Sequence, residues 1–286
     1  MWSDEFNRDG RPDAATWNYE QGFVRNHEDQ WYQEENAWQE DGLLVIEARR
    51  EHNRPNPRYR AGSHDWRRQR PNIDYTSACL TTRGKRQFLY GRLEVSARIP
   101  TASGAWPAIW TLGEGMPWPS CGEIDLMEYY PIHGKPHILA NVAWGNDRPS
   151  DAVWNSKKIP FTHFTQRDPM WALRFHVWRM DWDETSIRLY LDDELLNEVM
   201  LSQTVNGSIG SGSNPFHSPQ YILLNLALGG DNGGPIDEAA LPMRYEIDYV
   251  RIYDRSGARQ ETLSKHEKHH HERNDEVMVR KNKNRK

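Results

Sequence analysis

The stretch from Cys121 to Tyr130 constrains the fold most, because it places three carboxylates among apolar residues. Acidic and apolar residues alternate from Glu123 to Met127, which is the period-2 pattern of a strand with one polar and one apolar face. Glu123 and Asp125 therefore share a face, whereas Glu128 would point to the opposite side of a regular strand. One extra residue, a β-bulge between Asp125 and Glu128, restores the parity, and bulges are favoured beside active sites.

Three acids gathered on one surface have the chemistry needed to cleave a glycosidic bond. Burial and like charges raise the pKa of at least one of them, so one group holds a proton while another is ionised. The protonated group can donate to the leaving oxygen, and the ionised group can attack the anomeric carbon or activate water. For these three acids taken alone, a solvated strand face and a metal site are alternative interpretations. The flanking residues are needed to choose among them.

Composition narrows the class of protein. The 286 residues allow one large β domain or two smaller ones, and the net charge of −5 argues against nucleic acid as the partner. Thirteen Trp residues suit a groove that stacks on sugar rings, although packing accounts for most of them. No run approaches the roughly 20 apolar residues of a membrane span. The two cysteines, Cys79 and Cys121, match no metal-ligand spacing and leave pairing open.

Strand-like segments with turn residues between them recur along the chain, without long amphipathic helices. This pattern predicts an all-β fold, a sandwich of two curved antiparallel sheets with a concave substrate cleft. We expect a catalytic domain over residues 1–255 and a charged C-terminal tail over residues 256–286, whose composition is typical of disorder. The strands are expected at residues 42–49, 75–82, 91–99, 137–144, 175–182, 186–191, 195–199, 221–228 and 245–253.

Seven segments in order resemble family 16 of the glycoside hydrolases, the group of laminarinases, β-glucanases and agarases. The resemblance implies a β-jelly roll and a retaining mechanism in which Glu123 is the nucleophile and Glu128 is the general acid and later the base. Asp125 would hydrogen-bond the nucleophile, and a retaining pair lies about 5–5.5 Å apart. The matching segments are residues 2–6, 26–32, 104–113, 122–128, 175–182, 224–230 and 248–253.

The resemblance also implies substrate-binding residues around the acids. Trp106 and Trp110 resemble aromatic residues beside the cleavage point, and their spacing of four gives them the same strand parity. Packing is the alternative for either of them, and a hydrogen-bonded core position is the alternative for His176. The expected substrate-binding set is Asn26, Glu28, Trp106, Trp110, Trp144 and His176.

No cofactor is expected for catalysis, but one metal is implied. Asp248 resembles a carboxylate that binds a structural calcium together with backbone carbonyls on the convex side, and oxygen ligands suit calcium. We expect a monomer without a membrane span, located outside the cell or in the periplasm because its substrate is a polysaccharide.

Two departures from the family and one basic loop bear on the substrate. Ala143 stands where many laminarinase-like members carry His, and Cys79 replaces the Arg of a frequent Ser-Ala-Arg. Residues 52–73 contain six Arg, whose guanidinium groups suit sulfate or carboxylate, with a solvated surface loop as the alternative.

We therefore predict an endo-acting β-glycanase for β-1,3- or mixed-linkage β-1,3/1,4-glucan. A β-galactan, whether agar-like, arabinogalactan-like or an O-glycan chain, is the alternative substrate. A transglycosylase and a non-catalytic carbohydrate-binding jelly roll are the alternative functions.

Overall fold

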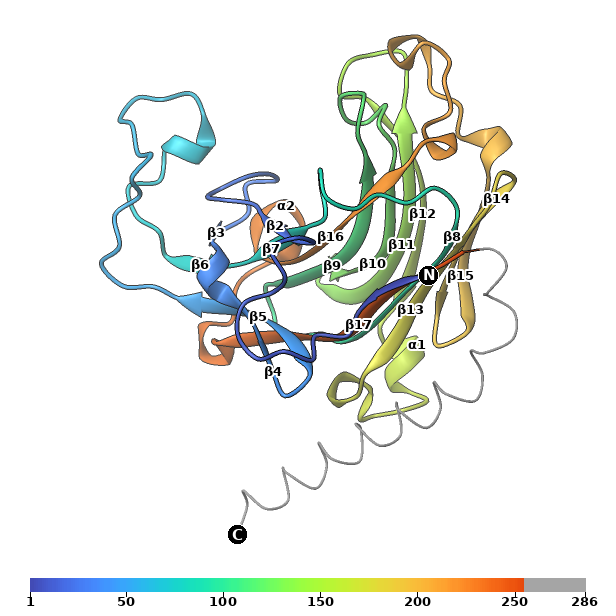
Figure 1. The fold of residues 1–286 in the computed structure, drawn as a ribbon. Coiled ribbons are helices and arrows are strands. Elements are labelled where there is room, and N and C mark those ends of the chain that lie inside the picture. Colours follow the sequence, from blue (N-terminus) through green and yellow to red (C-terminus); the bar gives the residue numbers. More distant parts are fainter. Residues whose placement is uncertain (255–286) are drawn as a thin grey trace.

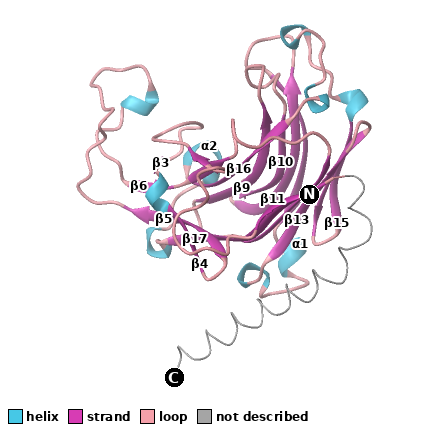
Figure 2. Cartoon of the chain, viewed as in Figure 1, coloured by secondary structure: helices cyan, strands magenta, loops and turns pink. Residues whose placement is uncertain are grey.

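The computed structural model describes residues 1–254, which form two large sheets packed face to face with little helix (Figures 1 and 2). This architecture confirms the predicted all-β sandwich. The charged tail predicted for residues 256–286 lies outside the described residues, so the domain boundary stays a prediction. In residues 1–254, no helix has the length and apolar character needed to cross a membrane.

The ten-stranded sheet has the order β15-β14-β13-β8-β17-β5-β6-β3, with β1 added on β17 and β4 on β5. Its pairs are antiparallel except for β3 with β6. The strands are β1 (Trp2–Asp4), β3 (Gln30–Tyr32), β4 (Ala37–Glu40), β5 (Leu43–Arg50), β6 (Tyr75–Ser77), β8 (Gly91–Arg98), β13 (His176–Trp182), β14 (Ser186–Leu191), β15 (Glu194–Met200) and β17 (Met243–Tyr253).

The seven-stranded sheet has the order β12-β11-β10-β9-β16-β7-β2, and all of its pairs are antiparallel. Its strands curve strongly, with the hollow side turned away from the other sheet (Figure 1). The strands are β2 (Asn18–Tyr19), β7 (Cys79–Thr81), β9 (Ala105–Gly113), β10 (Glu123–Ile132), β11 (Lys135–Gly145), β12 (Ala152–Pro160) and β16 (Gln220–Leu228).

Helical segments are short and lie in the connections. Two are single α-helical turns, α1 (Thr162–Thr165) and α2 (Gly230–Gly233). The 3₁₀ turns are Glu34–Asn36, Trp66–Arg68, Trp171–Leu173, Leu201–Gln203, Ser208–Gly210, Pro215–His217 and Glu238–Ala240.

The main core lies between the sheets and follows from strand alternation. In β13, His176 to Trp182, every second residue is buried, so Trp178 and Met180 point inward from the ten-stranded sheet. Ile124 and Leu126 of β10 point inward from the other sheet. This inward placement leaves the alternate residues of β10, including Glu123 and Asp125, on the outer, concave face.

The strand β12 is among those that the sequence analysis did not predict. β12 contains Lys157, Lys158 and Pro160, and it is the edge strand of the seven-stranded sheet. Lysine and proline are residues that protect sheet edges against further pairing, so they weaken the strand signal at the place where an edge strand occurs.

Candidate active site

The predicted bulge is present in β10. Asp125 pairs with Asn141 of β11, and the next pair in register is Glu128 with Leu139, so β10 uses one residue more than its partner. The same shift occurs against β9, between Asp125 and Met127. The extra residue returns Glu128 to the face of Glu123 and Asp125. We call the outer, concave face of the seven-stranded sheet that carries these three acids the active-site face.

Asp125 lies between the two glutamates and hydrogen-bonds both of them. Burial raises the pKa of all three carboxyl groups, and the negative charge of a neighbouring acid raises each pKa further. The hydrogen bond with Asp125 lowers the pKa of Glu123 and raises that of Glu128. The hydrogen bonds with Asp125 thus favour the ionised form of Glu123 and the protonated form of Glu128.

Fixed donors around the acids hold their orientation. The Asn141 amide donates to Asp125 at 3.2 Å and to Glu128 at 3.0 Å. The Trp106 indole donates to the other oxygen of Glu128 at 2.9 Å. The side chain of Trp118 hydrogen-bonds Glu123 and lowers its pKa. Each carboxylate of the trio thus has at least one partner that fixes its position.

Trp106 and Trp110 both lie on the active-site face, as predicted from their parity. Trp110 pairs in register with Asp125, and Trp106 reaches Glu128 from the same strand, β9. Trp110 packs in a second apolar cluster on this face, which also contains Tyr32, Cys79 and Tyr221. Cys79, one of the two departures from the family pattern, is therefore a buried free thiol beneath the active-site face.

A chain of buried hydrogen bonds connects Trp110 to Asn26. The Trp110 indole donates to Asn225 at 2.7 Å, and the Asn225 amide donates to the Tyr32 hydroxyl at 2.9 Å. That hydroxyl donates to Glu28 at 3.4 Å, and Asn26 donates to the other oxygen of Glu28 at 3.1 Å. Glu28 is only 2% exposed, so it supports the exposed Asn26 rather than reaching a ligand itself.

The segment that carries Asn26 packs closely against the backbone of Gly230. Asn26 has a positive φ of 55°, which Asn tolerates better than most residues. Gly230 at the start of α2 has φ +64°, and a Cβ there would lie 2.7 Å from the Asn26 carbonyl oxygen. Only glycine fits, which gives a physical reason for the Gly229-Gly230 pair after β16.

Two residues expected in the cleft lie elsewhere. Trp144 belongs to the core between the sheets, because its neighbour Ala143 is the residue paired with Glu123 and therefore faces outward. His176 lies on β13 of the other sheet, where its Nε2 contacts the Trp171 carbonyl at 2.7 Å and its ring stacks on Trp171. The structure therefore places Trp144 in the core between the sheets and His176 at a hydrogen-bonded position on the other sheet.

The Arg-rich loop folds against the segment that precedes β3. The Arg70 guanidinium donates to the carbonyls of His27 and Glu28 and lies over the ring of Phe23. Arg58 lies over the ring of Trp31 at 5.1 Å. These arginines hold the loop in place, and Figure 1 shows the loop projecting beside the active-site face.

Arg25 was not identified from the sequence, although it lies next to the site. It forms an ion pair with Glu20, and its guanidinium is 5.1 Å from the centre of the Trp110 ring. Its positive charge lowers the pKa of Glu28 and of Glu123. No local pattern indicates this role, because Arg25 and Trp110 come together only through the sheet.

Asp248 is buried on β17, where the register against β8 shifts between Ile247 and Tyr249. Within residues 1–254 no group of three or more His, Cys, Asp or Glu side chains is placed to hold a metal ion. A calcium ion at Asp248 would therefore rely mainly on backbone carbonyl oxygens, which calcium accepts. The calcium site stays a prediction.

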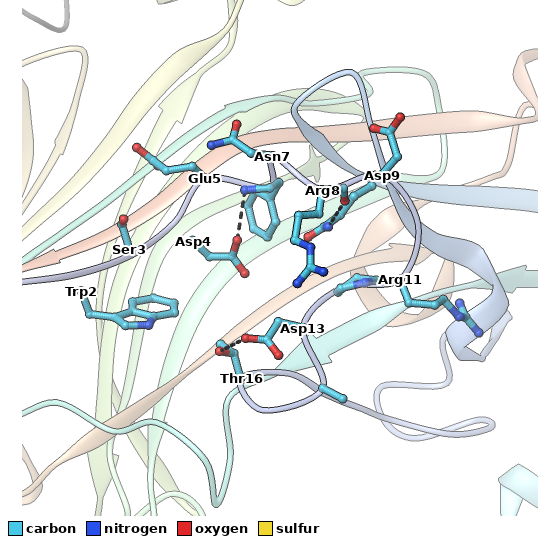
Figure 3. A pocket seen from close by; sticks show the side chains of 14 residues that line it. Trp2, Ser3, Asp4, Glu5, Asn7, Arg8, Asp9, Arg11, Asp13 and Thr16 are labelled. Atoms are coloured by element: carbon cyan, nitrogen blue, oxygen red, sulfur yellow. Dashed lines mark hydrogen bonds between the residues drawn. The ribbon is translucent and has the colours of Figure 1, made fainter.

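A pocket of about 580 Å³ lies against the N-terminal segment and contains none of the three acids (Figure 3). Two of its carboxylates, those of Asp4 and Asp13, already serve the local fold. Asp4 accepts from the Phe6 amide and the Trp17 indole, and Asp13 accepts from the Ala15 amide. The pocket is therefore a poorer candidate for chemistry than the acids of β10.

A curved β-sandwich with a bulged strand and three clustered acids on its concave face defines an enzyme that hydrolyses glycosidic bonds. The family model described as glycosyl hydrolases family 16 matches residues 23–251, and the chain belongs to this family.

Individual relatives agree with this assignment. A curated β-glucanase of Rhodothermus marinus is 35% identical over 88% of this chain and 84% of its own length. The structure of a laminarinase catalytic domain from Thermotoga maritima is 32% identical, with a TM-score of 0.70 over 89% of this chain and 97% of that one. A structure from work on endo-acting O-glycanases of the human gut microbiota is 35% identical, with a TM-score of 0.77 over 89% and 90%.

Proposed function

We propose that this chain is an endo-acting retaining β-glycanase whose first substrate class is β-1,3- or mixed-linkage β-1,3/1,4-glucan. The observation that carries the proposal is the bulge in β10, which brings Glu123, Asp125 and Glu128 onto one face. The similarity to the Rhodothermus marinus β-glucanase and the Thermotoga maritima laminarinase supports the choice of glucan.

In the first step, the ionised Glu123 attacks the anomeric carbon while Glu128 transfers its proton to the leaving oxygen. This produces a glycosyl ester on Glu123 and a free sugar hydroxyl. In the second step, Glu128 takes a proton from water, whose oxygen attacks the same carbon and releases Glu123. The hydrogen bonds with Asp125 support these roles, because they lower the pKa of Glu123 and raise that of Glu128.

The test is hydrolysis of laminarin, lichenan, agarose and an arabinogalactan, with proton NMR of the first products. Retention predicts that the new reducing end appears first as the β anomer. Glu123→Ala and Glu128→Ala should each abolish hydrolysis in a folded protein. Full activity in either variant, or an α anomer as the first product, would refute the assignment.

A β-galactan or an O-glycan chain is the second candidate substrate. The higher TM-score of the structure from the O-glycanase study supports it. Ala143, paired in register with Glu123, also lacks the polar group that the laminarinase-like pattern places there. Mucin O-glycans in the same screen separate the two candidates, since release from them without release from laminarin selects the second.

We also propose that the protein acts outside the cell or in the periplasm, because its substrate class is found there, and that it works as a monomer. Fractionation of the source cells and size-exclusion chromatography with light scattering test these two points. An intracellular activity, or a dimer at assay concentration, would contradict them.

A further inference from the structure

Two tryptophans remain unexplained by packing. Trp118 and Trp154 are 42% and 46% exposed, which makes them the most exposed Trp side chains in residues 1–254. Their rings lie together, with centroids 6.5 Å apart and planes tilted by 49°. Exposing two large apolar rings side by side is unfavourable in water, so such a pair marks a contact surface.

The strand register places this pair relative to the catalytic acids. Glu123 of β10 pairs with Ala143 of β11, and Ala143 pairs with Trp154 of β12. Residues paired across neighbouring antiparallel strands project to the same face, so Trp154 shares the active-site face with Glu123. At about 4.8 Å per strand, the two positions are about 10 Å apart, which is more than one sugar ring spans.

The connection between the acids and Trp154 is continuous. Trp118 hydrogen-bonds Glu123 through its side chain, while its ring packs toward Trp154. Ala143 lies between Glu123 and Trp154 with only a methyl group, so no side chain at that position separates them. β12 is the edge of the sheet, which leaves the outer side of Trp154 open.

We propose that Trp154, together with Trp118, forms a sugar-stacking subsite at the β12 edge of the active-site face. The ligand is a pyranose ring of the polysaccharide, one or more residues away from the ring that is cleaved. Its C–H face packs on the indole, whose negative π face attracts polarised C–H groups. The proposal rests on the proposed function, because it assigns a subsite to the same substrate chain.

The polar neighbours favour a sugar over a protein as occupant. Ser156 and Lys158 follow Trp154 at spacings of two on β12 and therefore project to the same face. Hydroxyl and ammonium groups beside an aromatic ring match the alternating C–H and hydroxyl surface of a sugar. A protein interface would need a much larger apolar area than two rings supply.

The test compares Trp154→Ala, Trp154→Phe and a matched control, Leu195→Ala, which truncates a side chain of 49% exposure on β15 of the other sheet. Substrates are laminari-oligosaccharides from trimer to heptamer, or galactan oligosaccharides if the polymer screen selects a galactan. Trp154→Ala should lower kcat/KM for the heptamer about tenfold more than for the trimer, mainly through KM. Trp154→Phe should recover most of the loss, and Leu195→Ala should leave both substrates unchanged.

Two outcomes separate this inference from the proposed function. Equal losses on short and long substrates, or none, would overturn the subsite while leaving the catalytic assignment intact. If the wild type hydrolyses none of the polymers, the catalytic proposal fails, and the subsite is judged by native affinity electrophoresis in gels containing laminarin, galactan or mucin. Retardation that Trp154→Ala abolishes and Trp154→Phe keeps supports it, and retardation unaffected by Trp154→Ala, or absent in the wild type, overturns it.

Discussion

Glu123→Gln is expected to stabilise the folded protein at neutral pH while it abolishes hydrolysis. Burial and the charge of Glu128 raise the pKa of Glu123 to about 8, although the hydrogen bond with Asp125 lowers it in part. An unfolded Glu has a pKa near 4.3. Because the folded pKa is the higher one, the free energy of unfolding has its full value below about pH 4, and it decreases as pH rises from there toward about pH 8.

The size of the effect follows from the difference between the two pKa values. One pKa unit corresponds to about 1.4 kcal/mol, so at pH 7 the raised pKa of this carboxyl group lowers the free energy of unfolding by roughly 4 kcal/mol. Gln has nearly the same shape and has no charge to bury, so the variant avoids this loss. For a domain of this size the gain corresponds to an increase in Tm of about 8–16 °C.

Differential scanning calorimetry of the wild type and Glu123→Gln between pH 4.5 and 8 measures the difference. The gain in Tm should be small at pH 4.5 and should grow with pH. Glu35→Gln, which changes an exposed carboxylate, controls for the general effect of removing one negative charge. A gain that does not change with pH, or a variant less stable than the wild type at pH 7, would refute the reasoning.

Two further predictions concern the surroundings of the acids, and a third concerns the implied calcium site. Trp106→Phe removes a donor to the Glu128 carboxylate, so the pKa of Glu128 should rise and the alkaline limb of the kcat/KM profile should move to higher pH; a shift to lower pH contradicts this. Tyr32→Phe removes the hydroxyl that accepts from the Asn225 amide, so it should lower the free energy of unfolding by about 1–3 kcal/mol and raise KM severalfold. A variant with wild-type stability and KM would show that this chain of hydrogen bonds contributes to neither. If calcium binds at Asp248, a chelator should lower Tm, and a Tm unaffected by chelator and by added calcium removes the site.

The arrangement of the acids was predictable because it depends on one strand. Side-chain parity in β10 is a local property, so the mismatch of Glu128 with Glu123 is visible in the sequence and requires a bulge. The same parity argument placed Trp106 and Trp110 together on β9. Neither inference needed to know which strands lie next to β10.

The sequence analysis misplaced residues whose position depends on the register between strands or on which sheet a strand joins. Trp144 and Ala143 are adjacent, and a shift of one residue in the pairing of β11 with β10 would exchange the core position for the cleft position. His176 lies in a matching segment, but β13 belongs to the other sheet, where stacking on Trp171 buries it. Glu28 was predicted to contact sugar, but its buried carboxylate accepts hydrogen bonds from Asn26 and Gln30, which only the folded chain brings together.

The same dependence on register explains why the sugar could not be named from the motif. Glu123, Ala143 and Trp154 come from three strands, and their alignment appears only when the sheet forms. A histidine in place of Ala143 would discriminate sugars by hydrogen bonds to their hydroxyl groups. A sugar that lacks the matching hydroxyl would leave the imidazole without a partner, which costs binding free energy. Alanine offers no such hydrogen bond, so in the proposed subsite the aromatic ring of Trp154 would discriminate sugars by the C–H face of the pyranose. Galactose and glucose differ in that face through the axial or equatorial hydroxyl at C4, so Ala143→His is the substitution that should shift the preference between galactan and glucan.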